Sequence, residues 1–193
     1  HPGYSLVVGD LSQEEFRVAA YLSGDPAMLD IIHNNRDWHA ATAMAAFGRR
    51  NVSELIGEER YYGKQSNFAK LNGAGVATIA HTCKVQRGVA QQLSDSFDHL
   101  HERYQEWREE QAEAITDTGY AYTYYGRRRY LPAVWAGDEG MRVEAIRQGI
   151  NVPIQGTAAD ILKLALRRMW ERLQGHDAHL VSCVHDELII EAL

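Results

Sequence analysis

Apolar and polar residues alternate in three parts of the chain, and each part predicts β-strands. The segment Tyr4–Gly9 alternates near the start of the chain and predicts one strand. Alternation across Gly119–Leu131, on either side of Gly126, predicts a hairpin. Two apolar runs near the end, His179–Val184 and Leu188–Ala192, predict another hairpin. We expect the strands at the two ends of the chain to pair in one antiparallel sheet.

Apolar residues recur every three or four positions through most of the remaining chain, which predicts amphipathic helices. The expected helices are Ser12–Leu22 with Ser12 as its cap, a short one opened by Asp25-Pro26, Asp37–Phe47, Glu59–Leu71, a long one over Gln86–Asp117, Asp138–Asn151, and one from about Ala158 to Leu173. Asn72-Gly73 should close the fourth helix as a left-handed cap, and Pro153 should interrupt the chain after the sixth. Few strands and many helices predict an α+β fold.

Composition and charge narrow the class of protein. With 193 residues and 45% hydrophobic content, the chain is long enough for one domain with a substantial core. The net charge of −6 argues against a protein that binds nucleic acid simply by coating phosphates, although Arg127–Arg129 forms a local basic cluster. No apolar run approaches the ~18–20 residues that a membrane-spanning helix needs. We therefore expect a monomer in the cytoplasm with no membrane partner.

The cysteines and the chain ends carry two further expectations. Cys83 and Cys183 are too few and too far apart for a disulfide scaffold or a zinc site, so we expect reduced, buried thiols. The sequence begins at His1 without an initiator methionine and stops at Leu193 directly after a predicted strand. We expect it to be part of a longer polypeptide.

Two aspartates stand at strand ends that the expected sheet would bring together. Asp10 ends the first predicted strand, and Asp186 lies in the turn Val184–Glu187 of the last hairpin. Each aspartate alone is also explained as a turn or cap residue. Side by side, they would be suitable ligands for Mg²⁺, which binds one or two carboxylates together with substrate phosphates. Two-metal phosphoryl transfer needs carboxylates that bridge ions about 4 Å apart.

The predicted helix over Glu59–Gly73 carries two cations and an aromatic ring on one face. Arg60, Lys64 and Phe68 follow one another at intervals of four residues. Fixed positive charge suits a triphosphate, and a flat ring suits stacking against a nucleobase. The alternative is a solvated face with an incidental phenylalanine.

Three further groups have weaker signals. Arg147, Asn151 and Gln155 are also spaced by four, and their donors and acceptors suit base edges in a minor groove. The alternative there is a helix cap beside an exposed arginine. Arg127–Arg129 suits backbone phosphates or a solvated turn. His39 lies in a predicted helix, and one histidine in a helix more often has a structural role than a functional one.

These motifs, taken together and in order, resemble family A DNA polymerases, the DNA polymerase I type. Asp10–Arg17 is similar to that family's motif A, D-Y-S-Q-I-E-L-R, and Arg60–Gly73 to its motif B, R-x₃-K-x₃-F/Y-x₃-Y-G. His185-Asp186-Glu187 matches its motif C, H-D-E. Three more similar segments are Asp37–Ala43 (D-I-H-x-x-T-A), Gly126–Pro132 (G-R-R-R-Y-x-P) and Asn151–Asp160 (N-x-P-x-Q-G-T-A-A-D).

The resemblance implies a right-hand polymerase architecture with the thumb absent. Residues 1–24 and 119–193 would form the palm with a small antiparallel sheet, and residues 25–118 the helical fingers. Motif B lies at 60–73 and motif C at 185–187. The implied activity is DNA-templated DNA synthesis from dNTPs in replication or repair, on primer-template DNA, with a thumb and an exonuclease elsewhere in a longer protein. Asp10, Asp186 and the backbone carbonyl of Leu11 would hold two Mg²⁺ ions.

The resemblance also implies roles for individual side chains. Arg60, Lys64 and His39 would clamp the triphosphate, with Lys64 also placed to protonate pyrophosphate. Phe68 would stack on the incoming nucleotide, and Glu15 would exclude ribonucleotides. Gln13 would join the nucleotide site. The implied primer and template contacts are Asn72, Gly73, Arg147, Asn151, Gln155, His185, Glu187, Arg127 and Arg128.

The chain departs from the family pattern at several positions. Motif A has Leu11 in place of tyrosine and Glu14 in place of an apolar residue. Motif B has Ala69 in place of glycine and Asn72 in place of a tyrosine that lies beside the templating base, which puts base selection in doubt. The run Asn67–Gly75 is more similar to phage polymerases than to cellular ones. We therefore expect a bacterial cell as the setting, with a virus-encoded gene as one origin.

Two rival functions stay open. A single-subunit RNA polymerase shares the palm, but Glu15 argues against it because a ribonucleotide enzyme needs room at the 2′-hydroxyl. A non-catalytic nucleic-acid-binding fragment is the other rival. The presence of Asp10, Lys64 and Asp186 argues against that reading for the parent protein.

Overall fold

The strands at both ends of the chain meet in one three-stranded antiparallel sheet, as expected. In the computed structural model, which describes residues 3–193, β1 is Ser5–Asp10, β4 is Ala178–Val184 and β5 is Glu187–Ala192. The strand order is β1-β5-β4, with Ser5 opposite Ala192 and Asp10 opposite Glu187. Because β5 is central, the end of β1 lies next to the turn that joins β4 to β5.

The second predicted hairpin is also present. Strands β2 (Tyr120–Tyr122) and β3 (Arg128–Tyr130) pair antiparallel. Gly126 adopts a φ of 82° in the connecting turn, a conformation that glycine reaches without steric cost.

Helices make up most of the remaining chain, and the α+β class is confirmed. They are α1 Glu14–Ser23, α2 Pro26–His33, α3 Trp38–Phe47, α4 Glu59–Leu71, α5 Val76–Cys83, α6 Arg87–Leu100, α7 Glu102–Thr118, α8 Glu139–Asn151 and α9 Thr157–Leu173, with short 3₁₀ turns at Val52–Glu54 and Pro132–Trp135 and a π-helical turn at Val152–Gly156. Asp25, Asp37 and Asp138 cap α2, α3 and α8 by accepting a backbone N–H three residues on. Gly73 adopts a φ of 77° after α4, as predicted.

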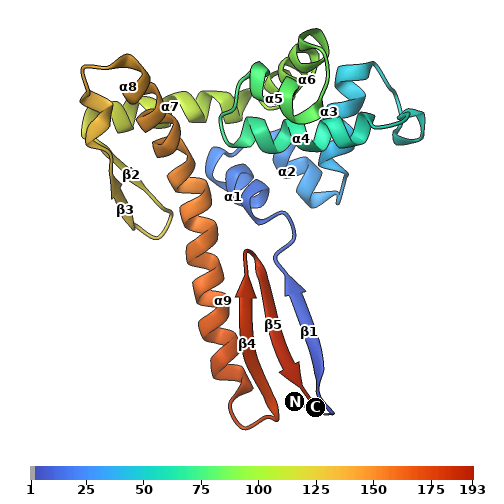
Figure 1. Cartoon of the computed structure of the whole chain (residues 1–193), viewed down its shortest axis with the longest axis vertical. Coiled ribbons are helices and arrows are strands. Elements are labelled where there is room, and N and C mark those ends of the chain that lie inside the picture. The colour runs from blue at the N-terminus through green and yellow to red at the C-terminus, as the bar shows by residue number, and fades with distance from the viewer. Residues whose placement is uncertain (1–2) are drawn as a thin grey trace.

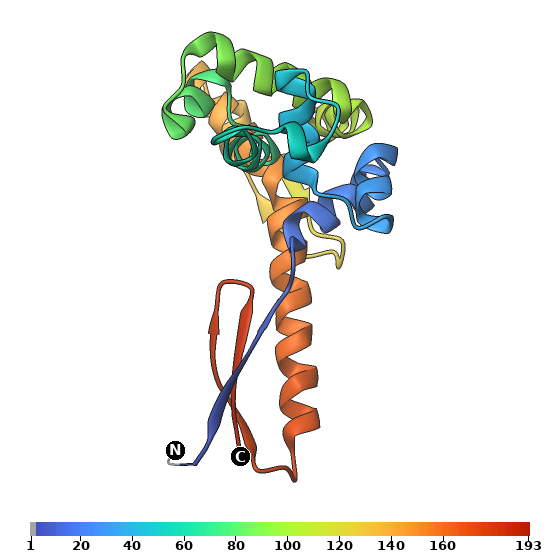
Figure 2. The ribbon, with the colours of Figure 1, turned by 90° about the vertical axis from the view of Figure 1, so that its right-hand side faces the viewer.

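Figure 1 shows a wide helical body above a narrow stalk. Helix α9 runs along the stalk beside the sheet, and α8 leads into it from the body. Figure 2 shows α9 and the sheet as neighbouring layers, and α9 contacts β4. β1 starts and β5 ends at the free end of the stalk, while the turn between β4 and β5 points toward α1. Within residues 3–193, no helix is both long and apolar enough to span a membrane.

The largest apolar core lies in the helical body around Trp38. The Trp38 ring stacks on Phe16 with centroids 3.9 Å apart. Phe97, Tyr104 and Met28 are fully buried beside it. The stalk is different, since every residue of β1 is exposed and Leu6 is 68% exposed. Most of the burial energy therefore lies in the body that carries α1, α3 and α4.

The predicted helix over Gln86–Asp117 is wrong, because the chain breaks at His101. Helices α6 and α7 meet there, with His101 at φ −127° and ψ 51°. The His101 side chain is fully buried and its Nε2 accepts a hydrogen bond from Trp38 Nε1 at 3.1 Å. Its Nδ1 lies 3.6 Å from Asp25 Oδ1. The break allows the His101 side chain to contact Trp38 and Asp25, and the helical periodicity of the sequence does not indicate these contacts. Helix α5 was not predicted at all.

Two other expectations at helix ends are wrong. Ser12 does not cap α1. The N-cap residue of that helix is Gln13, which has a left-handed conformation (φ 52°) and forms no capping hydrogen bond through its side chain. Pro153 does not interrupt the helical path. It lies early in the π-helical turn, where its missing N–H is tolerated, and α8 continues through that turn into α9.

The two thiols differ in environment. Cys83 is buried, as expected, and both cysteines are free. Cys183 is exposed, contrary to expectation, because it lies on β4, an edge strand whose residues are mostly exposed.

The His101 contact should be worth a measurable part of the folding free energy. We expect His101→Leu to lower the free energy of unfolding by about 1–3 kcal/mol, because it leaves the buried Trp38 N–H without an acceptor. Chemical denaturation measures this. His99→Leu is the matched control, since the His99 side chain is 84% exposed, and it should cost less than about 0.5 kcal/mol. Equal losses in the two variants would contradict the prediction.

Candidate nucleotide and catalytic cleft

A cleft of about 610 Å³ lies between α1, α4, the start of α9 and the turn that joins β4 to β5. Nine of the residues predicted from the sequence line it: Gln13, Glu15, His39, Arg60, Lys64, Phe68, Gln155, His185 and Asp186. These residues come from segments that are far apart in the sequence. The cleft places the acidic turn and the basic helix in one cavity.

The acidic side is built from two adjacent strand ends. The N–H of Leu11 donates to the carbonyl of Asp186 at 3.2 Å, which fixes the end of β1 against the β4–β5 turn. His185 makes that two-residue turn possible with a φ of 55°. Asp10 and Leu11 line an adjoining cavity on the other side of Glu14. The predicted pairing of the strands at the two ends of the chain is confirmed: β1, which ends at Asp10, pairs with β5, which begins one residue after Asp186.

The donor set fits a cation that is completed by substrate. Asp10 and Asp186 offer carboxylates, and the Leu11 carbonyl, which accepts the Glu14 N–H at 3.2 Å, has a second lone pair. Among the described residues, no group of three or more His, Cys, Asp or Glu side chains is arranged to hold a metal. Two carboxylates without a closed cage suit Mg²⁺, which keeps waters and substrate phosphates as its other ligands.

Glu14 adds a carboxyl group that sequence reasoning noticed only as a departure from the family. Burial, followed by the charges of Asp186 and Glu15, raises the pKa of Glu14 to about 7. Its Oε1 is buried without a hydrogen-bond partner. Burial and the charge of Asp186 also raise the pKa of Glu15. Burial accounts for the largest part of both shifts, and the remainder reflects carboxylates that lie close together, an arrangement that a bound cation would stabilise.

The basic side is positioned by Asp37, which the sequence marked only as a helix start and as the first residue of a segment similar to the family. Arg60 Nε donates to Asp37 Oδ2 at 2.6 Å, while Asp37 Oδ1 caps α3 at the N–H of Ala40. Burial alone would raise the pKa of Asp37, but these hydrogen bonds outweigh it and the pKa is lowered. Asp37 therefore holds the Arg60 guanidinium at the start of the face that carries Lys64. Its N-cap position was visible in the sequence, but its partner was not.

His39 lies against the same face. It is 7% exposed, and burial lowers its pKa to about 4, aided by Arg60 and Lys64 and opposed by Asp37. Near neutral pH this shift favours the uncharged imidazole, which can donate one hydrogen bond to a phosphate. Phe68 is 40% exposed, and its ring centroid is 5.5 Å from that of His39 and 6.0 Å from Lys64 Nζ.

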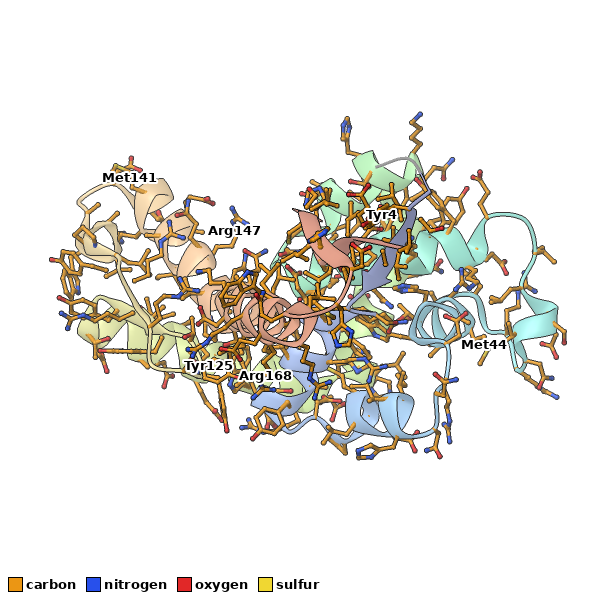
Figure 3. All side chains as sticks on the ribbon, turned by 90° about the horizontal axis from the view of Figure 1, so that it is seen from below. Tyr4, Met44, Tyr125, Met141, Arg147 and Arg168 are labelled. Carbon is orange, nitrogen blue, oxygen red and sulfur yellow. The ribbon has the colours of Figure 1, made fainter. Side chains whose placement is uncertain are left out.

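The remaining predicted contacts lie outside this lining. Asn72, Gly73, Arg147 and Asn151 gather at the end of α4, where the carbonyl of Asn72 accepts from Asn151 Nδ2 at 3.2 Å. Gly73 has a φ of 77°, a backbone conformation that residues with a side chain rarely adopt, so this glycine has a structural reason. Figure 3 shows Arg147 on the side of α8 that faces the other helices.

The hairpin arginines and Glu187 are not gathered at the cleft. Arg127 donates to Asp160 Oδ1 and to the carbonyl of Gly156, each at 2.9 Å. The Arg128 guanidinium lies 5.2 Å from the centroid of the Tyr120 ring. Glu187 begins β5 opposite Asp10. Arg127 thus joins the β2–β3 turn to the start of α9. Any contact of Arg127, Arg128 or Glu187 with DNA stays a prediction.

A three-stranded sheet beside a long helix, with Asp186 of the β4–β5 turn in one cleft with Arg60 and Lys64 of α4, places the chain in the class of right-hand nucleic-acid polymerases. The chain belongs to DNA polymerase family A, whose sequence model matches residues 1–193. It is 36% identical over 192 residues to a thermostable DNA polymerase I of Thermus aquaticus, covering 98% of this chain and 23% of that protein. It is 35% identical over 191 residues to DNA polymerase I of Pseudomonas aeruginosa, covering 98% and 21%.

A solved structure has the same fold. The POL domain of Pol1 from M. smegmatis, in complex with DNA primer-template and dNTP, matches with a TM-score of 0.90 and 29% identity. The match covers 100% of this chain and 34% of that chain. This chain therefore spans less than a quarter of the two relatives' lengths and about a third of the solved chain.

Proposed function

We propose that this chain forms the nucleotidyl-transfer site of a DNA-templated DNA polymerase. The reaction would join a dNMP from dNTP to a primer 3′-hydroxyl and release pyrophosphate, in replication or repair. The observation that carries the proposal is the single cleft in which Asp186 shares a cavity with Arg60 and Lys64. The bacterial relatives support a bacterial cell as the setting, and their greater length supports further domains in the same polypeptide.

The roles proposed for the parts of the chain follow from the positions of its helices and strands. Residues 1–24 and 119–193 are proposed as the palm and residues 25–118 as the fingers. Asp10, Asp186 and the Leu11 carbonyl would hold two Mg²⁺ ions, which when bound would activate the primer hydroxyl and neutralise phosphate charge. Arg60 and Lys64 would bind the triphosphate oxygens, and Lys64 Nζ would give a proton to the leaving pyrophosphate.

Neighbouring side chains would orient the nucleotide. His39 would donate a hydrogen bond to a phosphate in its neutral form. Phe68 would stack on the base or sugar, where a base–aromatic stack is worth about 1–3 kcal/mol. Glu15 would occupy the space needed by a ribose 2′-hydroxyl, with Gln13 beside it in the cleft. Movement of α4 toward the cleft would check the new base pair before chemistry.

Sugar selection separates this proposal from its closest rival. We expect the protein to use dNTPs over rNTPs, and Glu15→Ala to reduce that preference by on the order of 100-fold, because excluding one extra group from a shaped pocket is worth ~1–3 kcal/mol. Single-nucleotide primer extension, with protein in excess over DNA, measures kcat/KM for both sugars. Glu113→Ala, on the exposed side of α7, is the control.

The same assay decides between the rivals. A preference of the unaltered protein for rNTPs would favour a single-subunit RNA polymerase. Incorporation of neither nucleotide, with primer-template still bound in an anisotropy titration, would favour a non-catalytic nucleic-acid-binding fragment. An unchanged sugar preference in Glu15→Ala would contradict the role given to Glu15 alone.

A further inference from the structure

The side-chain amide of Asn72 is held between two fixed partners. Its Nδ2 donates to the carbonyl of Phe68 at 2.9 Å, one helical turn back in α4. Its Oδ1 accepts from Gln155 Nε2 at 2.7 Å. A backbone carbonyl can only accept, so the nitrogen of Asn72 must face Phe68 and its oxygen must face Gln155. The orientation of the Asn72 and Gln155 amides therefore follows from the Phe68 carbonyl, which can only accept a hydrogen bond.

Asn72 is also the point where three side chains from α8 and the π-helical turn converge. Its backbone carbonyl accepts from Asn151 Nδ2 at 3.2 Å and from Arg147 Nη1 at 3.4 Å. The Oδ1 of the half-buried Asn72 completes the set by binding Gln155. The end of α4 is thus joined to the segment that carries Gln155, and Gln155 itself is exposed and lines the cleft together with Asp186.

The contact with Asn72 restricts how Gln155 can present its amide. A 180° rotation of that amide would bring Gln155 Oε1 against Asn72 Oδ1, and two acceptors cannot form a hydrogen bond. One N–H of Gln155 is therefore used by Asn72, and Oε1 keeps a fixed place as the only acceptor of the amide. A tyrosine, which the family usually has at this position, has no amide with which to impose this orientation.

We propose that Asn72 is a positioning residue that orients Gln155 so that its Oε1 accepts a hydrogen bond from the base pair at the primer end. The inference rests on the proposed polymerase function. In the minor groove only a G·C pair offers a donor, the guanine N2 amino group, while A·T and T·A pairs offer acceptors alone. The protein should therefore extend a primer that ends in a G·C pair more efficiently than one whose terminal pair lacks that amino group.

Primers that end in guanine or inosine opposite cytosine test the proposal, because inosine lacks only the N2 amino group. The measured quantity is the ratio of single-nucleotide extension efficiencies, guanine over inosine. Gln155→Leu gives the baseline ratio, which includes the weaker pairing of inosine. We expect the unaltered protein to exceed that baseline by about 2–10-fold, the range for one net hydrogen bond.

Two substitutions at Asn72 separate orientation from simple loss of structure. Asn72→Asp loses the donor to the Phe68 carbonyl but keeps an oxygen that can accept from Gln155 Nε2, so it should keep the elevated ratio. Asn72→Leu has similar size but no polar atom, and its ratio should fall to the Gln155→Leu baseline. An elevated ratio in Asn72→Leu, or a baseline ratio in the unaltered protein, would overturn the proposal. A merely structural role would lower extension of both primers alike and leave the ratio unchanged.

A second measurement does not depend on catalysis. In NMR spectra of the ¹⁵N-labelled 193-residue chain, the side-chain NH₂ signals of Gln155 are assigned by their loss in Gln155→Leu. They should shift upfield in Asn72→Leu, where the hydrogen bond is lost, and should not shift upfield in Asn72→Asp, where a carboxylate oxygen still accepts. Signals that are insensitive to Asn72→Leu would overturn the proposed orientation. Failure of the polymerase proposal is distinct, since it would appear as absence of nucleotide incorporation by the unaltered protein.

Discussion

Replacing Asp186 with alanine should lower the single-turnover rate of nucleotide incorporation by at least about 1,000-fold, equivalent to roughly 4 kcal/mol of transition-state stabilisation. Asp186 lies in the two-residue turn between β4 and β5, next to the end of β1, and lines the cleft. Its removal would leave Asp10 without the carboxylate partner that neighbouring strands provide. The measurement is rapid-quench primer extension with protein in excess over DNA.

Two further variants show whether the charge or the turn is responsible. Asp186→Asn keeps the size and turn propensity of the side chain but removes its charge, and it should lose nearly as much activity as Asp186→Ala. Asp117→Ala, at an exposed position of α7, should leave the rate within a factor of two to three, an effect of about 0.5 kcal/mol at most. Substantial activity in Asp186→Ala would refute the assignment of Asp186 as a metal ligand.

Replacing Lys64 with methionine should lower incorporation by about 100–10,000-fold, the range for loss of a positioned proton donor. Lys64 shares the cleft with Arg60 and Asp186, and methionine preserves its length while removing charge and proton. Single-turnover extension across dNTP concentrations separates the maximal rate from apparent nucleotide binding.

Lys64→Arg tests which property of Lys64 matters. Arginine keeps the positive charge but does not release its proton, so nucleotide binding should stay close to normal while the maximal rate falls. Lys84→Met, at an exposed position after α5, is the control. A normal maximal rate in Lys64→Arg would show that charge alone is required and would contradict the proton-donor role.

Local signals in the sequence predicted most of the fold. Asp25-Pro26 and Asp37 mark helix starts through their own side chains, and Gly73 marks a helix end through a conformation that glycine favours. The antiparallel pairing of the first and last strands followed from their apolar patterns. The helix ends depend on residues within a few positions of one another, and each of the two strands carries its apolar pattern along its own sequence, although the strands themselves pair across the whole chain.

The errors arose where a distant partner decides the local structure. The break at His101 depends on Trp38, which is 63 residues away in the sequence. In the cleft, the sequence identified the residues that would touch a substrate but not the ones that hold them. Asp37 acts on the cleft through its hydrogen bond with Arg60, and Glu14 through its burial beside Asp186 and Glu15; both relations appear only after folding.

The π-helical turn at Val152–Gly156 joins α8 to α9 and determines the angle by which the side chains of α9 are rotated about the helix axis relative to those of α8. Each residue of an α-helix advances its side chains by about 100°, so losing or gaining one residue here would turn all of α9 by that angle relative to α8. The face of α9 that meets the cleft and β4 would then point elsewhere, although no side chain had been substituted. We expect changes in chain length to be excluded from these five positions.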